Sequence, residues 1–159
     1  MILNMLRKAP ELKDIDGWIN SDALTIEGLK GKVIFLDFWT YGCMNCQNTL
    51  PEMKKLHSRY SDQGLIIIGV HTPEFPYERN RKNVENAVKL AGLRYPIALD
   101  GKNSTWKLYG NQYWPRQTLI DQNGKIAYEH IGEGDYDEIE EKVVELLNER
   151  IKPPLPEVA

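Results

Sequence analysis

The most informative stretch of the chain reads Lys32-Val-Ile-Phe-Leu-Asp-Phe-Trp-Thr-Tyr-Gly-Cys-Met-Asn-Cys46. Its first part, residues 32–39, is a nearly continuous β-branched and aromatic run, which is typical of a strand buried on both faces. Apolar side chains then recur at helical intervals over residues 44–60, and a second apolar run follows at 65–70. We therefore expect a strand, helix, strand unit whose two strands run parallel.

The middle of the chain predicts further elements of both kinds. Residues 78–90 carry an amphipathic helical pattern that ends before Gly92, and a short strand is expected over 96–99. Ser104 is the expected N-cap of a short helix over 105–109. The alternation of strands and helices favours one α/β layered sheet over separate helical and strand regions.

A hairpin and a helix are expected in the last third of the chain. Two apolar runs, 116–121 and 125–131, are separated by a segment that contains Asn123-Gly124. An Asn-Gly pair favours a tight hairpin with positive φ angles, so these strands are predicted to be antiparallel. Residues 135–150 then show one apolar stripe at helical spacing, and three prolines stop the helix.

Length and composition favour one domain and exclude several classes of protein. The 159 residues suit a single core, which we place at 1–152, with a Pro-rich tail at 153–159. A net charge of -3 with well mixed signs argues against nucleic acid as a partner. No apolar run approaches the roughly 20 residues of a membrane span. No export signal is visible, which predicts a cytoplasmic protein. If the chain is part of a longer protein, an extracytoplasmic or membrane-tethered location fits equally.

Both cysteines lie where the first strand hands over to the first helix. Cys43 and Cys46 are three residues apart, a spacing that puts their side chains on one helix face, close enough to form a disulfide after modest tightening. The free amides and the dipole of a helix N-terminus stabilise a thiolate. Cys43, in the first turn, is therefore the candidate nucleophile, and Cys46, one turn deeper, is the candidate resolving thiol.

Asp37 is an acid in the middle of the apolar strand run. An ionised carboxylate is costly there unless it is paired, so its pKa should be raised. Such an acid beneath the cysteines could accept the proton of the resolving thiol. The alternative interpretation is an aspartate that is merely satisfied by local hydrogen bonds.

Two other interpretations of the cysteine pair are a structural disulfide and a metal site. A bridge that closes so small a loop would stabilise the fold little, because loop-closure stabilisation grows with loop length. A tetrahedral zinc site needs four ligands, and the three histidines, His57, His71 and His130, are isolated in the sequence. The pattern therefore favours redox chemistry, with no metal or organic cofactor.

The stretch from Asp37 to Cys46, followed by Pro51, resembles the active-site strand and helix of the thioredoxin-like superfamily. Leu24-Thr-Ile-Glu-Gly-Leu-Lys-Gly-Lys32 before the strand and the added region after Val70 resemble its TlpA/ResA branch. The segments His71-Thr-Pro-Glu-Phe75 and His130-Ile-Gly-Glu-Gly-Asp-Tyr136 are most similar to the thioredoxin-like domain of DipZ-type proteins. The resemblance implies a thioredoxin fold, with a central mixed sheet, helices on both faces, an N-terminal extension and an inserted strand and helix region.

The resemblance also implies roles for individual residues. Cys43 would attack, Cys46 would resolve and Asp37 would be the buried acid. Pro115 would be the cis-proline opposite the cysteines, although a trans bond is the general expectation for an X-Pro pair. The backbone at Trp114 would then pair with an extended substrate segment. Trp39 would pack beside the cysteine pair and shield it, as part of the substrate-binding surroundings.

Several positions depart from the family pattern. Thioredoxin has Trp where this chain has Gly42, and Gly-Pro where it has Met44-Asn45, which leaves the redox potential open. ResA-like proteins carry a glutamate three residues after the second cysteine, where this chain has Thr49. Glu74 is a substitute by its position in the pattern, but an ordinary solvated carboxylate fits this position as well.

Two rival functions use the same cysteines. A peroxiredoxin-like thiol peroxidase would use Thr40, Cys43 and Arg116, although Leu36 stands where that family has proline. A Sco-like copper or thiol chaperone would use Cys43, Cys46 and His130, but that family has one more residue between its cysteines. We therefore predict a monomeric thiol-disulfide oxidoreductase that reduces disulfides of protein substrates and receives electrons from a separate donor.

Overall fold

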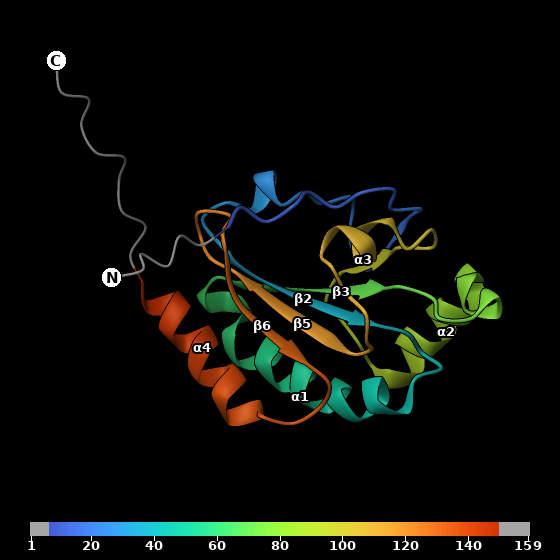
Figure 1. The fold of residues 1–159 in the computed structure, drawn as a ribbon. Helices are drawn as coiled ribbons and strands as arrows, with labels where there is room; N and C mark the ends of the chain where they lie inside the picture. The colour runs from blue at the N-terminus through green and yellow to red at the C-terminus, as the bar shows by residue number, and fades with distance from the viewer. Residues whose placement is uncertain (1–6, 150–159) are drawn as a thin grey trace, which may run out of the picture.

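A six-stranded mixed sheet forms the centre of the computed structural model, which describes residues 7–149. The order of its strands is β1-β4-β3-β2-β5-β6 (Figure 1). The strands are β1 (Trp18–Ile19), β2 (Val33–Trp39), β3 (Leu65–His71), β4 (Ile97–Leu99), β5 (Arg116–Ile120) and β6 (Ile126–Ile131). Neighbours β2, β3 and β4 run parallel, whereas β1, β5 and β6 are antiparallel to the strands they join.

Strand β2 lies in the middle of the sheet because every one of its residues can be buried. All seven side chains are buried, and the strand pairs with β3 on one edge and β5 on the other. Alternate residues point to opposite faces of a strand, so Asp37 shares a face with Phe35 and Trp39. That face is the one covered by helix α1.

The helices are α1 (Met44–Tyr60), α2 (Arg81–Ala91), α3 (Ser104–Leu108) and α4 (Tyr136–Asn148). Side chains of α1, α2 and α4 share one hydrophobic core with the sheet, and Figure 1 shows α1 and α4 on the same side of it. Helix α3 and the N-terminal segment cover the opposite face. Both faces of the sheet are therefore covered, as the thioredoxin fold predicts.

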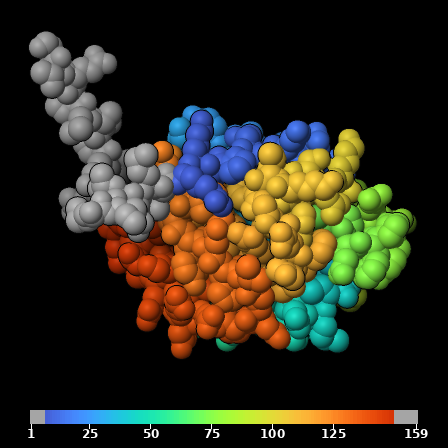
Figure 2. Space-filling model, in the orientation of Figure 1, coloured from blue at the N-terminus to red at the C-terminus, as the bar shows by residue number. Residues whose placement is uncertain are grey.

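The N-terminal segment belongs to the same layered structure as the rest of the chain. In Figure 2 it lies directly against the region of α3 on the surface of the molecule. The Thr105 hydroxyl donates to the carbonyl of Lys13 at 2.8 Å, and the Tyr109 hydroxyl donates to the carbonyl of Pro10 at 2.6 Å. Further along, the same segment supplies the short edge strand β1.

The structure confirms the predicted order of strands and helices and corrects four local details. Strand β1 was not predicted, because its two residues carry no periodic pattern. Helix α2 begins at Arg81 rather than at residue 78, because residues 76–79 form a separate 3-10 turn, η3 (Pro76–Arg79), and the Asn80 side chain caps α2. The predicted N-cap of α3, Ser104, is instead its first residue, and its hydroxyl donates to Asp14.

The β5–β6 turn also differs from the predicted Asn-Gly hairpin. Only Gly124 has a positive φ, of 80°, whereas Asn123 does not. The Asp121 carboxylate accepts hydrogen bonds from the backbone N–H groups of Asn123 and Lys125, each at 2.9 Å. An aspartate that binds its own turn in this way replaces the second left-handed residue.

The boundary at residue 152 and the tail 153–159 lie outside the described residues. Within residues 7–149, none of the helices has both the length and the apolar character of a membrane span.

Candidate active site

The two cysteines lie at the start of α1, as the sequence predicts. Cys43 is the N-cap residue, with extended backbone angles, and its sulfur accepts a hydrogen bond from the N–H of Cys46 at 3.2 Å. Both side chains are free thiols in this structure; Cys43 is partly exposed and Cys46 is buried. A substrate sulfur can therefore approach Cys43, whereas Cys46 is covered by protein.

The buried cysteine is the poorer acid. Burial raises the pKa of the Cys46 thiol far above its usual range, and its contact with Cys43 raises it further. A backbone hydrogen bond with Thr40 lowers this pKa only in part, and the negative charge of Asp37 acts in the opposite direction. Cys46 consequently needs a nearby base before it can act as a thiolate.

Asp37 interacts electrostatically with Cys46 and is the candidate for such a base. Its side chain is fully buried on the α1 face of β2, and neither carboxyl oxygen makes a full hydrogen bond within the described residues. Burial raises the pKa of Asp37 to about 7, and the amide of its cross-strand neighbour Gln117 offsets part of the rise. A carboxyl group with this pKa can both accept and release a proton near neutral pH.

His71, at the end of β3, holds the turn that leads into the cysteines. Its Nε2 accepts hydrogen bonds from the N–H of Tyr41 at 3.2 Å and from the Thr40 hydroxyl at 3.3 Å. The ring also stacks on Tyr41, with centroids 5.6 Å apart. Burial lowers the pKa of His71 to about 4, so the ring is neutral near pH 7 and its Nε2 lone pair is free to accept. The sequence pointed to His71 only as part of a resemblance.

Glu78 is a buried carboxylate beside the same turn, and sequence reasoning missed it. Its Oε1 accepts hydrogen bonds from the N–H groups of Glu74 and Phe75, at 2.8 and 3.1 Å. Its Oε2 fills the space beside Gly42 that a β-carbon would occupy. Glu74, the residue suggested by position in the family pattern, is itself exposed. The signal that could have found Glu78 is its third position in the turn after Phe75, which is typical of a capping box.

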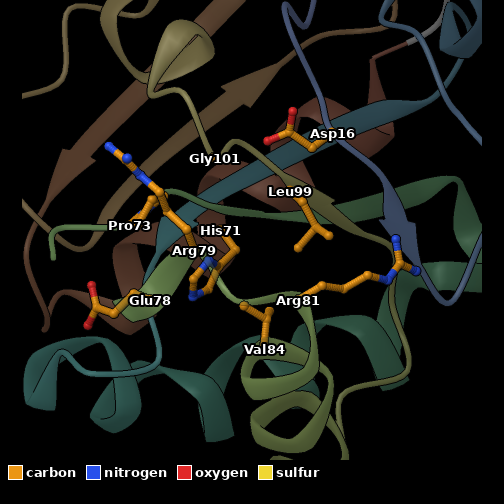
Figure 3. Close-up of a pocket in the computed structure, with 9 residues that line it drawn as sticks. All are labelled: Asp16, His71, Pro73, Glu78, Arg79, Arg81, Val84, Leu99 and Gly101. Atoms are coloured by element: carbon orange, nitrogen blue, oxygen red, sulfur yellow. The ribbon is translucent and has the colours of Figure 1, made fainter. Parts of the chain in front are cut away.

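A small pocket lies next to His71 and Glu78, which both line it. Figure 3 shows His71 projecting into it, with Glu78 on one side and Asp16 across from them. Neither cysteine lines this pocket. The carboxylate and the imidazole thus both line this pocket and support the cysteine turn.

The residues expected around a bound substrate divide into buried and surface positions. Trp39 has no exposed surface and packs edge-on against His71. Trp114 is partly exposed, stacks on Trp106 and donates its indole N–H to the carbonyl of Thr72 at 2.8 Å. The Trp114-Pro115 peptide bond is cis.

The residues that the rival functions require have other partners. His130 contacts Gln117 and Asp135 through its two ring nitrogens, and Arg116 forms an ion pair with Glu129. Among residues 7–149, no three His, Cys, Asp or Glu side chains gather as a metal site would require.

Comparison with known proteins finds a matching family and several similar proteins. The sequence matches the Redoxin family over residues 7–147. It is 44% identical over 144 residues to the protein DipZ of Mycobacterium bovis, covering 89% of this chain and 21% of that protein. It is 32% identical over 142 residues to the thiol-disulfide oxidoreductase ResA of Halalkalibacterium halodurans, covering 89% of this chain and 73% of ResA.

A solved structure shows the same likeness. The chain superposes on a thiol-disulfide isomerase from Corynebacterium glutamicum with a TM-score of 0.78 and 26% identity, covering 89% of this chain and 98% of that one. The chain thus corresponds to nearly the whole of one solved protein but to about a fifth of the length of DipZ.

Proposed function

We propose, because the chain belongs to the Redoxin family and has the thioredoxin fold, that it is a thiol-disulfide oxidoreductase acting on disulfides of protein substrates. The observation that carries this proposal is the unequal cysteine pair at the start of α1. Cys43 is accessible and its sulfur accepts a backbone N–H, whereas Cys46 is buried above Asp37. This arrangement supports attack by one sulfur and release by the other.

The first step is attack by Cys43. Its thiolate forms a bond to one sulfur of the substrate disulfide, and the bond between the two substrate sulfurs breaks. The departing sulfur leaves as a thiolate and takes a proton from water. The N–H of Cys46 that already points at the Cys43 sulfur stabilises the attacking thiolate, as does the N-terminus of α1.

The second step is release by Cys46. Its thiol gives its proton to the Asp37 carboxylate, and the new thiolate attacks the Cys43 sulfur. A Cys43–Cys46 disulfide forms, the mixed disulfide breaks, and the second substrate sulfur leaves as a thiolate that takes a proton from water. Two electrons have then passed from the dithiol to the substrate, and a separate dithiol donor is needed to restore the pair.

Exposed apolar side chains near the cysteines support a protein substrate. Met44 follows Cys43 directly and is 73% exposed, and the rings of Phe75 and Tyr77 stack on each other at the surface. The backbone around Trp114 and Pro115 is suited to pair with an extended segment. Such a surface binds a peptide mainly through its backbone and apolar contacts.

The cysteine roles predict opposite phenotypes for two serine variants. We expect Cys43→Ser to abolish reduction of insulin disulfides, because no nucleophile remains at the accessible position. We expect Cys46→Ser to accumulate a mixed disulfide with the substrate, visible on non-reducing gels and by mass spectrometry. Ser58→Ala, at an exposed position on the same helix, should retain full turnover. Full turnover by either cysteine variant would contradict the proposal.

The direction of electron flow is tested by the reduction potential of the pair. As a reductase the protein should have a potential near that of thioredoxin, about -270 mV, rather than near the oxidant DsbA, about -120 mV. Equilibration with glutathione, followed by alkylation and mass spectrometry, gives this value. A potential at the DsbA end would make the protein an oxidant of its substrates.

A further inference from the structure

A line of polar side chains crosses three neighbouring strands on the α1 face of the sheet. Asp37 of β2 lies opposite Gln117 of β5, and Gln117 lies opposite His130 of β6. Directly paired residues on adjacent strands project from the same face of a sheet. The line therefore leads from the fully buried Asp37 to Asp135, whose side chain is 65% exposed.

Hydrogen bonds fix the outer part of this line. His130 Nδ1 lies 2.7 Å from Gln117 Oε1, and its Nε2 lies 3.0 Å from Asp135 Oδ2. The amide oxygen of Gln117 can only accept, so the His130 Nδ1–H donates to it. With its oxygen held by His130, the Gln117 amide presents its NH2 group toward Asp37.

Asp37 lies at the inner end of this line. Its carboxyl oxygens make no full hydrogen bond, while the Gln117 amide is near enough to favour the charged form. A donor that closes on a carboxylate stabilises it most when the carboxylate is ionised. The contact thus gains strength in the state in which Asp37 can accept a proton.

We propose that Gln117 and His130 are positioning residues for Asp37: His130, anchored by Asp135, orients the Gln117 amide, and together they set the ionisation of the buried acid. The inference rests on the proposed function for its catalytic consequence. Asp37 must be ionised to take the proton of the Cys46 thiol, so the line would set the pH range in which the mixed disulfide is resolved.

Other titratable groups face the two ends of the line. Cys46 and Tyr95 interact electrostatically with Asp37. On the outer side, Tyr128 contacts Glu138, and the charge of Asp135 contributes to raising the pKa of Tyr128. These groups remain unchanged in the variants below, so a change in the titration midpoint of Asp37 reports on the line itself.

The direct test is the titration of Asp37 followed by carbon-13 NMR of its carboxyl group in the reduced protein. In the wild type the midpoint is expected near 7. His130→Ala should move it upward by about one pH unit, because the side chain that orients the Gln117 donor is lost. Asp135→Asn, at an exposed position that should not affect folding, should move it in the same direction by a smaller amount.

A matched control lies next to His130 on the same strand. Glu129 pairs with Arg7 and Arg116, and it points to the opposite side of β6. Glu129→Gln should leave the Asp37 midpoint in place. An unchanged midpoint in both His130→Ala and Asp135→Asn would overturn the inference, and so would an equal shift in Glu129→Gln.

A kinetic measurement links the titration to the reaction. The rate at which Cys46 releases a preformed mixed disulfide, measured against pH, should move with the Asp37 midpoint in His130→Ala. If the midpoint moves but the wild type reduces no protein disulfide, the proposed function fails and the positioning role stands. If the wild type reduces disulfides but the midpoint stays, only the positioning role fails.

Discussion

Asp37 and Cys46 are the two buried groups between which a proton passes in the proposed reaction. Burial raises the pKa of both, since neither a carboxylate nor a thiolate is well solvated inside the protein. The carboxyl nevertheless ionises at far lower pH than the thiol. Asp37 is therefore charged at pH values where Cys46 still holds its proton, and transfer from sulfur to oxygen can accompany attack.

We expect Asp37→Asn to slow release of the mixed disulfide without preventing its formation. The amide has nearly the shape of the acid but cannot accept a proton, and general-base contributions are typically about 100- to 10,000-fold. Stopped-flow measurement of both steps between pH 5 and pH 9 checks this. In the wild type the release step should rise through pH 7, and a parallel rise in Asp37→Asn would remove the acid from the mechanism.

Glu78 occupies the space that a side chain at Gly42 would need. A β-carbon on Gly42 would collide with Glu78 Oε2, and the other carboxyl oxygen is held by two backbone N–H groups. Sequence comparison shows only that the tryptophan of thioredoxin is missing at this position. The structure shows that a buried carboxylate occupies the space.

We expect Gly42→Ala to lower the free energy of unfolding by about 1 to 3 kcal/mol, as overpacking at a buried contact typically does. Denaturation by urea measures this loss. In a Glu78→Ala background the space is vacant, so the same substitution should cost much less. Equal costs in both backgrounds would show that the two residues do not compete.

Helix α3 is an element whose capping the sequence placed at the wrong residue. The Asp100 carboxylate, not Ser104, accepts the N–H groups of Thr105 and Trp106, at 3.1 and 3.0 Å. It also accepts the hydroxyl of Thr72 at 2.8 Å, which ties α3 to the segment after β3. Burial raises the pKa of Asp100, while these hydrogen bonds lower it in part. One side chain thus joins two elements that are far apart in the sequence.

We expect Asp100→Ala to destabilise the protein by about 2 to 4 kcal/mol, because three donors lose their acceptor in a buried place. Thermal unfolding followed by circular dichroism measures the effect. Asp22→Ala, at an exposed position, is the matched control and should change the melting temperature little. A small effect for Asp100→Ala would show that water or another side chain replaces the carboxylate.

The whole molecule carries two buried groups that oppose each other as the pH changes. The pKa of Asp37 is raised to about 7, so stability contributed by its neutral form is lost as the pH rises from 4 through 7. The pKa of His71 is lowered to about 4, so stability is lost as the pH falls from 6.5 through 4. Over this range the two contributions partly cancel.

Replacing Asp37 should remove one of these two pH-dependent contributions to stability. We expect the free energy of unfolding of Asp37→Asn, relative to that of the wild type, to rise by about 3 kcal/mol between pH 5 and pH 8, because the variant buries no charge. Urea denaturation at the two pH values gives the difference. A gain that is equal at both pH values would mean that Asp37 does not change its ionisation in this range.

The sequence was sufficient for features that depend on neighbours along the chain. The apolar run of β2, the periodicity of α1 and the position of both cysteines at its start followed from local patterns. So did the expectation that burial perturbs Asp37, since an acid inside a continuous apolar strand has few neighbours that could solvate it. Family resemblance supplied the cis peptide before Pro115, which base rates alone would not favour.

Only the tertiary structure could place the groups that act across the fold. Glu78 reaches Gly42 from a turn 36 positions later, and His71 reaches Tyr41 from the next strand. The line from Asp37 through Gln117 to His130 depends on the registers of β2, β5 and β6. A strand register is set by pairing between distant segments, and a shift of one residue would turn these side chains to the other face. Local sequence patterns do not determine that pairing. For this reason the contacts of these residues could be identified only in the folded chain.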